Sequence, residues 1–213
     1  MSVKPARSSL PPSKQGAKSQ RAREAICRAT VGCLYELGYS ATSINRVAAR
    51  AGLSKGAVQH HFPIKEDLMT ATADHLLRQT QRFADRIRAG RGDGGSVAQE
   101  LMLNWSKMID TPEYRALLEL LVATRTDREL AGRLKPTLLQ WNRDIDRSQL
   151  ALYEAASGDD DEVILLMHMY RALMSGLLIQ ESYFDGPTDF SQVLARWAEL
   201  MAPLLKGRRR PAS

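Results

Sequence analysis

The sequence is poor in the residues that mark several fold classes. Its 213 residues include two cysteines and 6% aromatic residues, and prolines are few after the first 12 positions. Runs of alternating apolar and polar residues, which signal half-buried strands, are also absent. These shortages point to helices. The hydrophobic content of 44% is enough for a sizeable core, and we predict an all-α fold.

The chain also lacks the features of secreted and membrane proteins. Cys27 and Cys33 lie in one expected helix. Six helical residues rise about 9 Å, more than the roughly 7 Å that a disulfide can span. No apolar run is expected to cross a bilayer, and the segment SSLPPSKQG stands where a signal peptide would have its apolar core. We therefore expect free thiols, a soluble cytoplasmic protein and no membrane partner.

Acidic residues are absent from the first 23 positions, and charge is unevenly distributed along the chain. Residues 1–65 contain eleven Lys and Arg but two acids, a net charge of +9, whereas the remainder has a net charge of −3. A basic front on a slightly acidic body predicts a polyanionic partner at one end. We expect residues 1–17 to be a disordered basic arm and residues 207–213 a basic tail.

Start and stop signals divide the front of the chain into short helices. An apolar face of helical period begins near residue 18 and ends at Gly38, which can adopt a left-handed cap. Ser43 can cap a helix of about two turns that ends at Gly52. Ser54 can cap a third helix that ends near residue 62, and a longer helix then runs to about residue 89.

The rest of the chain repeats such start signals. They are Ser96 with Gln99, Thr111 before Pro112, Thr126 with Glu129, and Asp159 with Glu162. Each has the spacing of a capping box or places proline at a favoured first helical position. They predict helices at about 96–110, 112–124, 127–156, 160–184 and 189–206, with Pro136 kinking the third of these.

The two short helices around Gly52 need tertiary support, because helices of about two turns are unstable alone in water. Residues that could lock them together are Val47, Ala48, Ala51, Leu53, Val58 and Phe62. This pattern is typical of a helix-turn-helix, which places its second helix in the DNA major groove. An ordinary helical hairpin is the alternative, and the basic charge of the region disfavours it.

The stretch INRVAARAGLSKGAVQHHFPIKEDL, preceded by GYSATS, resembles the tetracycline-repressor (TetR) family of bacterial regulators. The resemblance covers residues 20–70. It implies a dimeric DNA-binding regulator, with a helix-turn-helix domain at 18–65 and a helical effector-binding and dimerisation domain at 66–206. Two positions depart from the family pattern: Gln59 replaces a phosphate-binding Tyr, and Ile64 replaces a helix-capping Ser or Asn.

DNA contacts divide into base readers and phosphate anchors. Outward-facing side chains of the third helix are the expected base readers: Lys55, Gln59 and His60. Expected phosphate contacts are Ser43, Arg46, Ser54, His61 and Lys65, the last carried over from the family. An N-terminal arm could enter the minor groove with Arg7, Lys14, Lys18 and Arg21. For each of these residues, a solvated polar side chain without a DNA role remains the alternative.

Signatures of catalysis and cofactor binding are missing. The adjacent pair His60 and His61 has no ligand partner at zinc-site spacing, and GRGDGG lacks the Lys-Ser/Thr ending of a phosphate-binding loop. We expect no enzyme, no metal and no cofactor. Two rival functions stay open: an enzyme built on a helical bundle, and a DNA-coating or nucleoid-associated scaffold that needs no small molecule.

The C-terminal helices are expected to hold an effector and to dimerise. Expected pocket residues are Trp105, Met108, Tyr114, Trp141, Met167, His168 and Tyr170, which would suit a small, largely apolar effector. In the resembled family the last two helices pair with their symmetry mates. The expected dimer contacts are Leu173, Ser175, Gly176, Leu177, Trp197, Met201 and Leu204. Ordinary core packing is the alternative for each residue.

Overall fold

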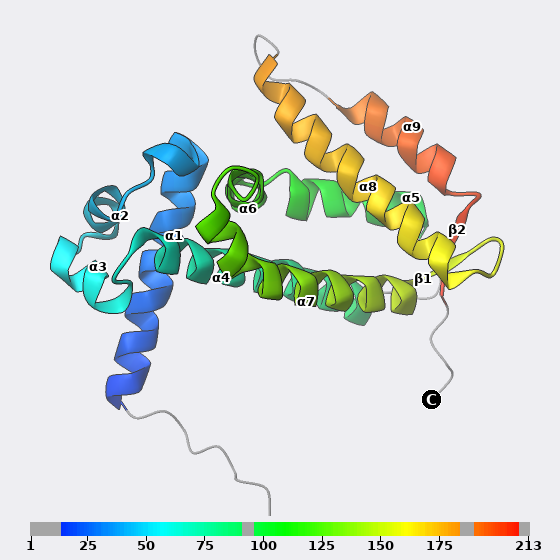
Figure 1. Cartoon of the computed structure of the whole chain (residues 1–213). Helices are drawn as coiled ribbons and strands as arrows, with labels where there is room; N and C mark the ends of the chain where they lie inside the picture. Colours follow the sequence, from blue (N-terminus) through cyan, green and yellow to red (C-terminus); the bar gives the residue numbers. More distant parts are fainter. Residues whose placement is uncertain (1–13, 91–95, 184–189, 209–213) are drawn as a thin grey trace, which may run out of the picture.

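The computed structural model describes residues 14–90, 96–183 and 190–208, and these are almost entirely helical (Figure 1). The first four helices are α1 (Lys14–Ala41), α2 (Ile44–Ala51), α3 (Lys55–His61) and α4 (Lys65–Gly90). Next come α5 (Val97–Asn104), a π-helical turn η1 (Trp105–Ile109), α6 (Pro112–Ala123) and α7 (Arg128–Leu152). The chain ends with β1 (Tyr153–Ala155), α8 (Asp160–Gln180), the 3₁₀ turn η2 (Glu181–Tyr183), α9 (Ser191–Met201) and β2 (Leu205–Gly207). The predicted all-α fold is confirmed.

Helices α1, α2 and α3 and the start of α4 enclose one small core. Ile26, Phe62 and Leu68 are at most 1% exposed within it. The two short helices begin as predicted, because Ser43 accepts a hydrogen bond from Arg46 N and Ser54 accepts one from Ala57 N. Burial of one face of each helix supplies the stability that their length alone cannot.

Both predicted glycine stops have left-handed backbone. Gly38 interrupts α1 with φ 74°, and Gly52 caps α2 with φ 66° and ψ 31°. The Gly52 N–H donates to the carbonyls of Ala48 and Ala49. A side chain at either position would strain the backbone, so these turns explain why glycine follows each apolar face.

A second core joins the front of the molecule to the rest. The far face of α1 packs on α6, and α4 packs on α7. Helix α4 belongs to both cores: Leu68 lies in the helix-turn-helix core, whereas Met69, Ala73 and Leu76 lie in the second. The sequence boundary at 65/66 therefore falls at the start of a helix that is shared between the two parts.

The predicted helix ends at 156 and 206 are wrong. Helix α7 stops at Leu152 and α9 at Met201, and β1 pairs antiparallel with β2 so that Ala155 faces Leu205. Pro203 has no N–H to donate and disfavours helical backbone at the residue before it, which favours the end of α9 at Met201. Tyr153 and Leu205 are 5% and 1% exposed, so the pairing is stabilised by burial that a single segment does not reveal.

Two smaller corrections concern helix starts. Asp127, rather than Thr126, caps α7 by accepting from Leu130 N. Helix α1 starts at Lys14, inside the segment predicted to be disordered, while residues 1–13 lie outside the described chain. Helix α7 continues through Pro136, and the kink expected there stays a prediction. Gly132, whose carbonyl loses its partner there, lies on the exposed side, where water can bind that carbonyl.

Helix α8 contradicts the expectation that no segment could cross a membrane. By length and composition it is the one described helix that could do so. Core helices of soluble proteins pass the same test, and seven α8 residues, including Val163, Tyr170 and Met174, are buried against the third core, which α5, α8 and α9 form. Burial of one face of α8 in this core therefore accounts for much of its apolar character.

One tyrosine connects the two parts of the molecule. The Tyr39 hydroxyl donates to Asp127 Oδ2 at 2.5 Å, and the Tyr39 N–H donates to Glu119 Oε2 at 3.1 Å. Lys65 Nζ donates to the Tyr39 carbonyl at 2.9 Å and lies 4.2 Å from the centre of its ring. The link from α1 to the N-termini of α4 and α7 therefore passes through Tyr39.

We expect Tyr39→Phe to lower the free energy of unfolding by about 1 kcal/mol, since it removes a hydrogen bond to a partly exposed carboxylate. Urea denaturation at pH 7 measures this. The matched control is Tyr35→Phe on the same helix, whose ring is 49% exposed, and it should change stability little. Equal losses in the two variants would contradict the role given to Tyr39.

The difference between wild type and Tyr39→Phe should also depend on pH. The hydrogen bond from Tyr39 is the largest cause that lowers the pKa of Asp127 below its ordinary value of 3.8. A lowered folded-state pKa stabilises the protein above that ordinary value, and the gain is lost as pH falls through the folded pKa. The stability difference should therefore shrink in acid, as measured by urea denaturation at a series of pH values.

Candidate DNA interface and effector cavity

The outer face of α3 presents polar side chains to solvent. Lys55, Gln59 and His60 are exposed, whereas Val58 on the opposite face is fully buried. Gly56 is also exposed, which keeps this surface low between the long side chains. Figure 1 shows α2 and α3 at one end of the molecule, with no other described helix covering the outer side of α3. The geometry suits insertion of α3 into a major groove.

The expected phosphate contacts border this face. Ser43 and Ser54 use their hydroxyl oxygens to cap α2 and α3. Arg46 is exposed, and its Nη1 donates to the Ala41 carbonyl at 2.7 Å. The His61 ring lies edge-on to His60, with 5.3 Å between ring centres. Burial of His61, followed by the charges of His60 and Arg23, lowers its pKa.

Lys65 differs from the other phosphate candidates because its ammonium already has partners inside the protein. It donates to the Tyr39 carbonyl and lies against the Tyr39 ring. Burial lowers its pKa. The family resemblance suggested a phosphate contact, whereas the position of Nζ favours a role in holding the start of α4 against α1.

The basic arm is described only in part. Lys18 and Arg21 are exposed on the first turns of α1, whereas Arg7 and the Lys14 side chain lie outside the described residues. Arg23 was not among the expected contacts. Its Nη1 donates to the His61 carbonyl at 3.0 Å, and its guanidinium lies 4.3 Å from the centre of the Phe62 ring. Arg23 thus holds α1 against the end of α3. Because these segments are far apart in the sequence, the spacing of residues could not predict this contact.

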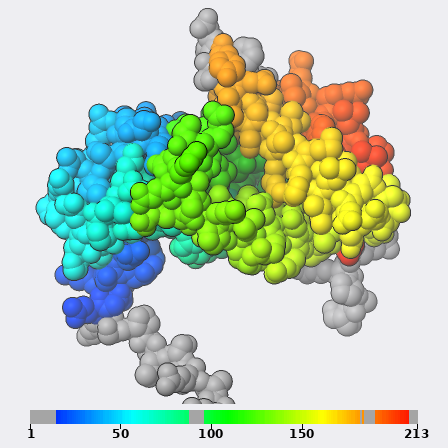
Figure 2. Space-filling view, in the orientation of Figure 1, coloured from blue at the N-terminus to red at the C-terminus, as the bar shows by residue number. Residues whose placement is uncertain are grey.

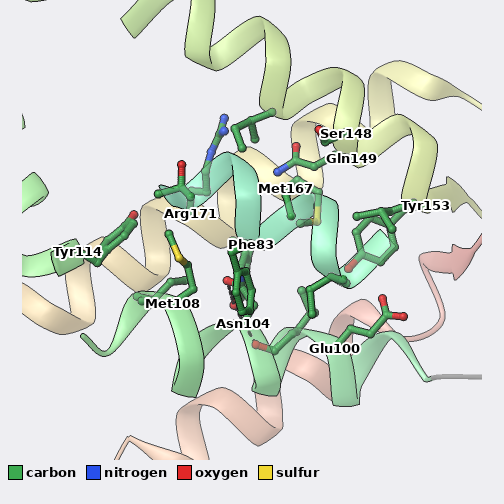
Figure 3. A pocket seen from close by; sticks show the side chains of 18 of the residues that line it. Phe83, Glu100, Asn104, Met108, Tyr114, Ser148, Gln149, Tyr153, Met167 and Arg171 are labelled. Carbon is green, nitrogen blue, oxygen red and sulfur yellow. Dashed lines mark hydrogen bonds between the residues drawn. The ribbon is translucent and has the colours of Figure 1, made fainter. Parts of the chain in front are cut away.

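A cavity lies between α4, η1, α7 and α8 (Figure 3). The free space inside it is about 100 Å³. Five of the seven expected pocket residues line it: Met108, Tyr114, Trp141, Met167 and Tyr170. The lining is mostly apolar, with a few polar groups at defined positions.

Two expected pocket residues lie elsewhere. Trp105 packs edge-on against Phe190, with ring centres 6.3 Å apart, on the side of α5 that faces α9. His168 is exposed, and its Nε2 lies 3.2 Å from Asp146 Oδ1. Both residues lie on helix faces that point away from the cavity. The spacing of residues in the sequence did not show which face of each helix would line it.

The polar groups of the cavity are held by partners from several helices. Tyr170 Oη lies 3.0 Å from the Leu101 carbonyl and 3.1 Å from Asn104 Oδ1, and burial raises its pKa. Trp141 Nε1 donates to Thr80 Oγ1 at 2.7 Å, which joins α7 to α4. These bonds fix the cavity wall before any ligand enters.

Arg171 is the cavity residue that the sequence interpretation missed. Its side chain is 20% exposed, and its Nη2 lies 3.8 Å from Asp146 Oδ1. Among the described residues, its buried Nη1 has no hydrogen-bond partner, and neither has Gln149 Oε1. Burial is the largest effect on the pKa of Arg171 and lowers it, although Asp146 acts in the opposite direction. The signal available in the sequence was a single arginine within the apolar stretch of α8.

An apolar stripe runs along the outer faces of α8 and α9. Exposed apolar residues of the stripe are Leu165, Met169, Ile179, Val193, Leu200 and Leu204. Figure 2 shows α8 and α9 on the side of the molecule opposite α2 and α3. On α8, positions 165, 169, 172, 176 and 179 follow alternating steps of four and three, which is the spacing of a helix-pairing seam.

The expected dimer contacts only partly coincide with this stripe. Leu204 is exposed, and Leu173, Gly176 and Trp197 are partly exposed. Leu177 and Met201 are 5% and 1% exposed because they point into the core of their own subunit. Ser175 also points inward, since its Oγ lies 3.2 Å from the Tyr114 hydroxyl. The outward stripe is thus shifted by about one helical position from the residues expected.

Metal binding has no support in the described ranges. No group of three or more His, Cys, Asp or Glu side chains there is placed to hold an ion. Cys27 and Cys33 are buried and free, and burial raises the pKa of each thiol.

Comparison with known proteins agrees with the helix-turn-helix geometry. Residues 26–72 match the family model "Bacterial regulatory proteins, tetR family". An HTH-type transcriptional regulator of Mycobacterium tuberculosis is 29% identical over 175 residues, which cover 80% of this chain and 89% of the relative. The HTH-type regulator CymR of Pseudomonas putida is 30% identical over 129 residues, or 59% of this chain and 63% of CymR.

A third relative and two solved structures extend the comparison. The nicotine-responsive repressor HdnoR of Paenarthrobacter nicotinovorans is 26% identical over 78% of this chain and 86% of its own. A TetR family regulator of Marinobacter aquaeolei has a TM-score of 0.56 at 20% identity, covering 92% of this chain and 100% of that one. The multidrug binding protein EbrR, complexed with ethidium, has a TM-score of 0.56 at 21% identity, covering 83% and 97%. The chain therefore belongs to the TetR family of DNA-binding transcriptional regulators.

Proposed function

We propose that this regulator is a ligand-responsive repressor that binds an inverted-repeat operator as a homodimer in the cytoplasm. The observation that carries the proposal is the outer face of α3, where Lys55, Gln59 and His60 are exposed on a helix whose other face is buried. Lys can donate to guanine and Gln can pair with adenine in the major groove. Residues 18–65 would act as the DNA-binding domain and residues 66–206 as the effector and dimerisation domain.

The apolar stripe on α8 and α9 supports the homodimer. Leu165, Met169 and Leu200 are 59%, 46% and 49% exposed, and a stripe of such residues is costly to leave in water. A twofold axis beside α8 and α9 would pack the stripe against its own copy. Two copies of α3 would then face DNA together, as an inverted repeat requires.

The cavity and α4 support control by a ligand. Thr80, Phe83 and Ile87 on the second half of α4 line the cavity, whereas Leu68 on its first turn packs in the helix-turn-helix core. A ligand that prefers one position of α4 would therefore also change the position of α3. The relative HdnoR is named as nicotine-responsive and the neighbour EbrR as a multidrug binding protein, which favours a small-molecule effector here.

A DNA-coating scaffold is the less favoured alternative. That function needs no cavity, and a scaffold would be expected to fill this space with its own side chains. The mostly apolar cavity, with Tyr170 and Arg171 as polar groups in its wall, favours a regulator.

Substitution of the two main base readers tests DNA recognition. We expect Lys55→Ala and Gln59→Ala each to change the consensus at one position per half-site and to weaken the preferred site by about 1–3 kcal/mol. Sequencing of fragments selected from a random DNA pool measures the consensus. An inverted repeat is expected for the wild type.

A lysine far from α3 provides the control. Lys135 is exposed on α7, so Lys135→Ala should leave consensus and affinity unchanged. A wild-type selection without any inverted repeat would contradict the proposed function and favour the scaffold. Uniform weakening of all sites by Lys55→Ala would reassign that residue to phosphate binding.

Charge placed in the apolar stripe tests the dimer. We expect Leu200→Glu to produce monomers, because two carboxylates would be buried near the twofold axis. Leu139→Glu on α7 is the matched control, since Leu139 and Leu200 are both 49% exposed. Sedimentation equilibrium measures the mass of each variant. A dimer that persists in Leu200→Glu and dissociates in Leu139→Glu would place the interface elsewhere.

A further inference from the structure

We propose that the effector is an organic carboxylate with an apolar body, and that its carboxylate pairs with Arg171 inside the cavity. The inference rests on the proposed ligand-responsive function and names the chemical class of its ligand. Arg171 and Trp141, whose ring centre lies 5.6 Å from the guanidinium carbon, form the end of the cavity that would receive the anion.

The charge of Arg171 is only partly compensated within the protein, by Asp146 and by the Trp141 ring, whose centre lies 5.6 Å from the guanidinium carbon. Its nearest carboxylate oxygen, Asp146 Oδ1, is 3.8 Å away and is also 3.2 Å from His168 Nε2. Nη1 is buried without a hydrogen-bond partner among the described residues. A buried charge with unused donors is destabilising unless a partner is supplied. A ligand carboxylate would supply it, and the planar guanidinium can bind such a group through two parallel hydrogen bonds.

The rest of the cavity suits an apolar body. Phe83, Ile87, Ile145, Leu152 and Met167 line it, and Met and aromatic side chains adapt to irregular apolar shapes. Figure 3 shows Arg171 and Glu100 on different sides of the cavity, with Phe83 and Met167 between them. Apolar side chains thus separate Arg171 from Glu100, the carboxylate among the described lining residues.

The approach to the cavity is also positively charged. A neighbouring groove is lined by Arg82, Arg86 and Lys107, with Glu113 as its acid. Groove and cavity share four lining residues: Thr80, Phe83, Met108 and Tyr114. Cations around such a mouth raise the local concentration of anions. The groove therefore favours an anionic ligand independently of Arg171.

A single carboxylate fits better than a more highly charged group. Arg171 is the one cation among the described residues that line the cavity. A phosphate monoester would bring about two charges into a mostly apolar space, and a second charge would lack a partner there.

The test uses the purified full-length protein and two matched pairs of probes: 2-naphthoate with 2-naphthamide, and decanoate with decanamide. Calorimetric titration should show at least one carboxylate binding about tenfold or more tightly than its amide. Arg171→Met should remove this preference by weakening carboxylate binding about tenfold, with amide binding unchanged. Equal affinity of acid and amide for the wild type, or no binding of either acid, would overturn the proposal.

The melting temperature without ligand separates a binding role from a structural one. If Arg171 awaits a ligand anion, Arg171→Met should melt at or above the wild-type temperature and lose the stabilisation by carboxylates. A large fall in melting temperature would instead assign Arg171 to a structural ion pair with Asp146 and overturn the proposal. Arg147→Met is the matched control, because the Arg147 side chain is 70% exposed, and it should bind all probes as the wild type does.

DNA measurements distinguish this inference from the proposed function. Suppose that the wild type selects an inverted repeat and that an amide or the cation ethidium, but no carboxylate, releases the protein from that DNA. The proposed repressor function is then supported, and the carboxylate proposal fails. If a carboxylate binds through Arg171 but no DNA sequence is selected, the ligand class stands and the repressor fails.

Discussion

Much of the molecule depends on α4 being one continuous helix. Its 26 residues extend about 39 Å at 1.5 Å per residue. Leu68 at one end is part of the helix-turn-helix core, and Phe83, about four turns further on, lines the cavity. A helix transmits displacement along its axis because its backbone hydrogen bonds resist bending. A change in packing at the cavity therefore reaches α3 without any intermediate loop.

The contacts around Tyr39 limit how α4 can move. Lys65 at the N-terminus of α4 is held by the Tyr39 carbonyl and ring, and the Tyr39 hydroxyl is held by Asp127 at the N-terminus of α7. Movement of α4 relative to α7 must stretch one of these contacts or carry Tyr39 with it. Since Tyr39 follows Gly38, where α1 is already interrupted, the chain can yield there with little loss of helix. This favours a pivot at Gly38 and Tyr39.

The sequence predicted local features well and tertiary ones poorly, for physical reasons. Glycines at 38 and 52 and caps at Ser43 and Ser54 act within a few residues, so spacing reveals them. The β1–β2 pair joins residues about 50 apart, and neither strand is long enough to show a period. The sequence did not indicate a role for Arg171, because that role depends on the residues that pack around it. A charge on an apolar helix is either exposed or buried, and only packing decides which.

The same argument explains why the exposed apolar stripe differs from the expected dimer contacts. Helix α8 has apolar residues around most of its circumference, so a pattern of apolar positions cannot separate the side that packs inward from the side that meets a partner. In the structure Tyr170, Met174 and Leu177 fill the subunit core, whereas Leu165, Met169 and Ile179 are exposed. Arg171 lies between these two faces. Its burial thus depends on how α8 is rotated, and a dimer contact that fixes this rotation would also fix the charged end of the cavity. Dimerisation and effector binding are expected to be coupled through that one helix.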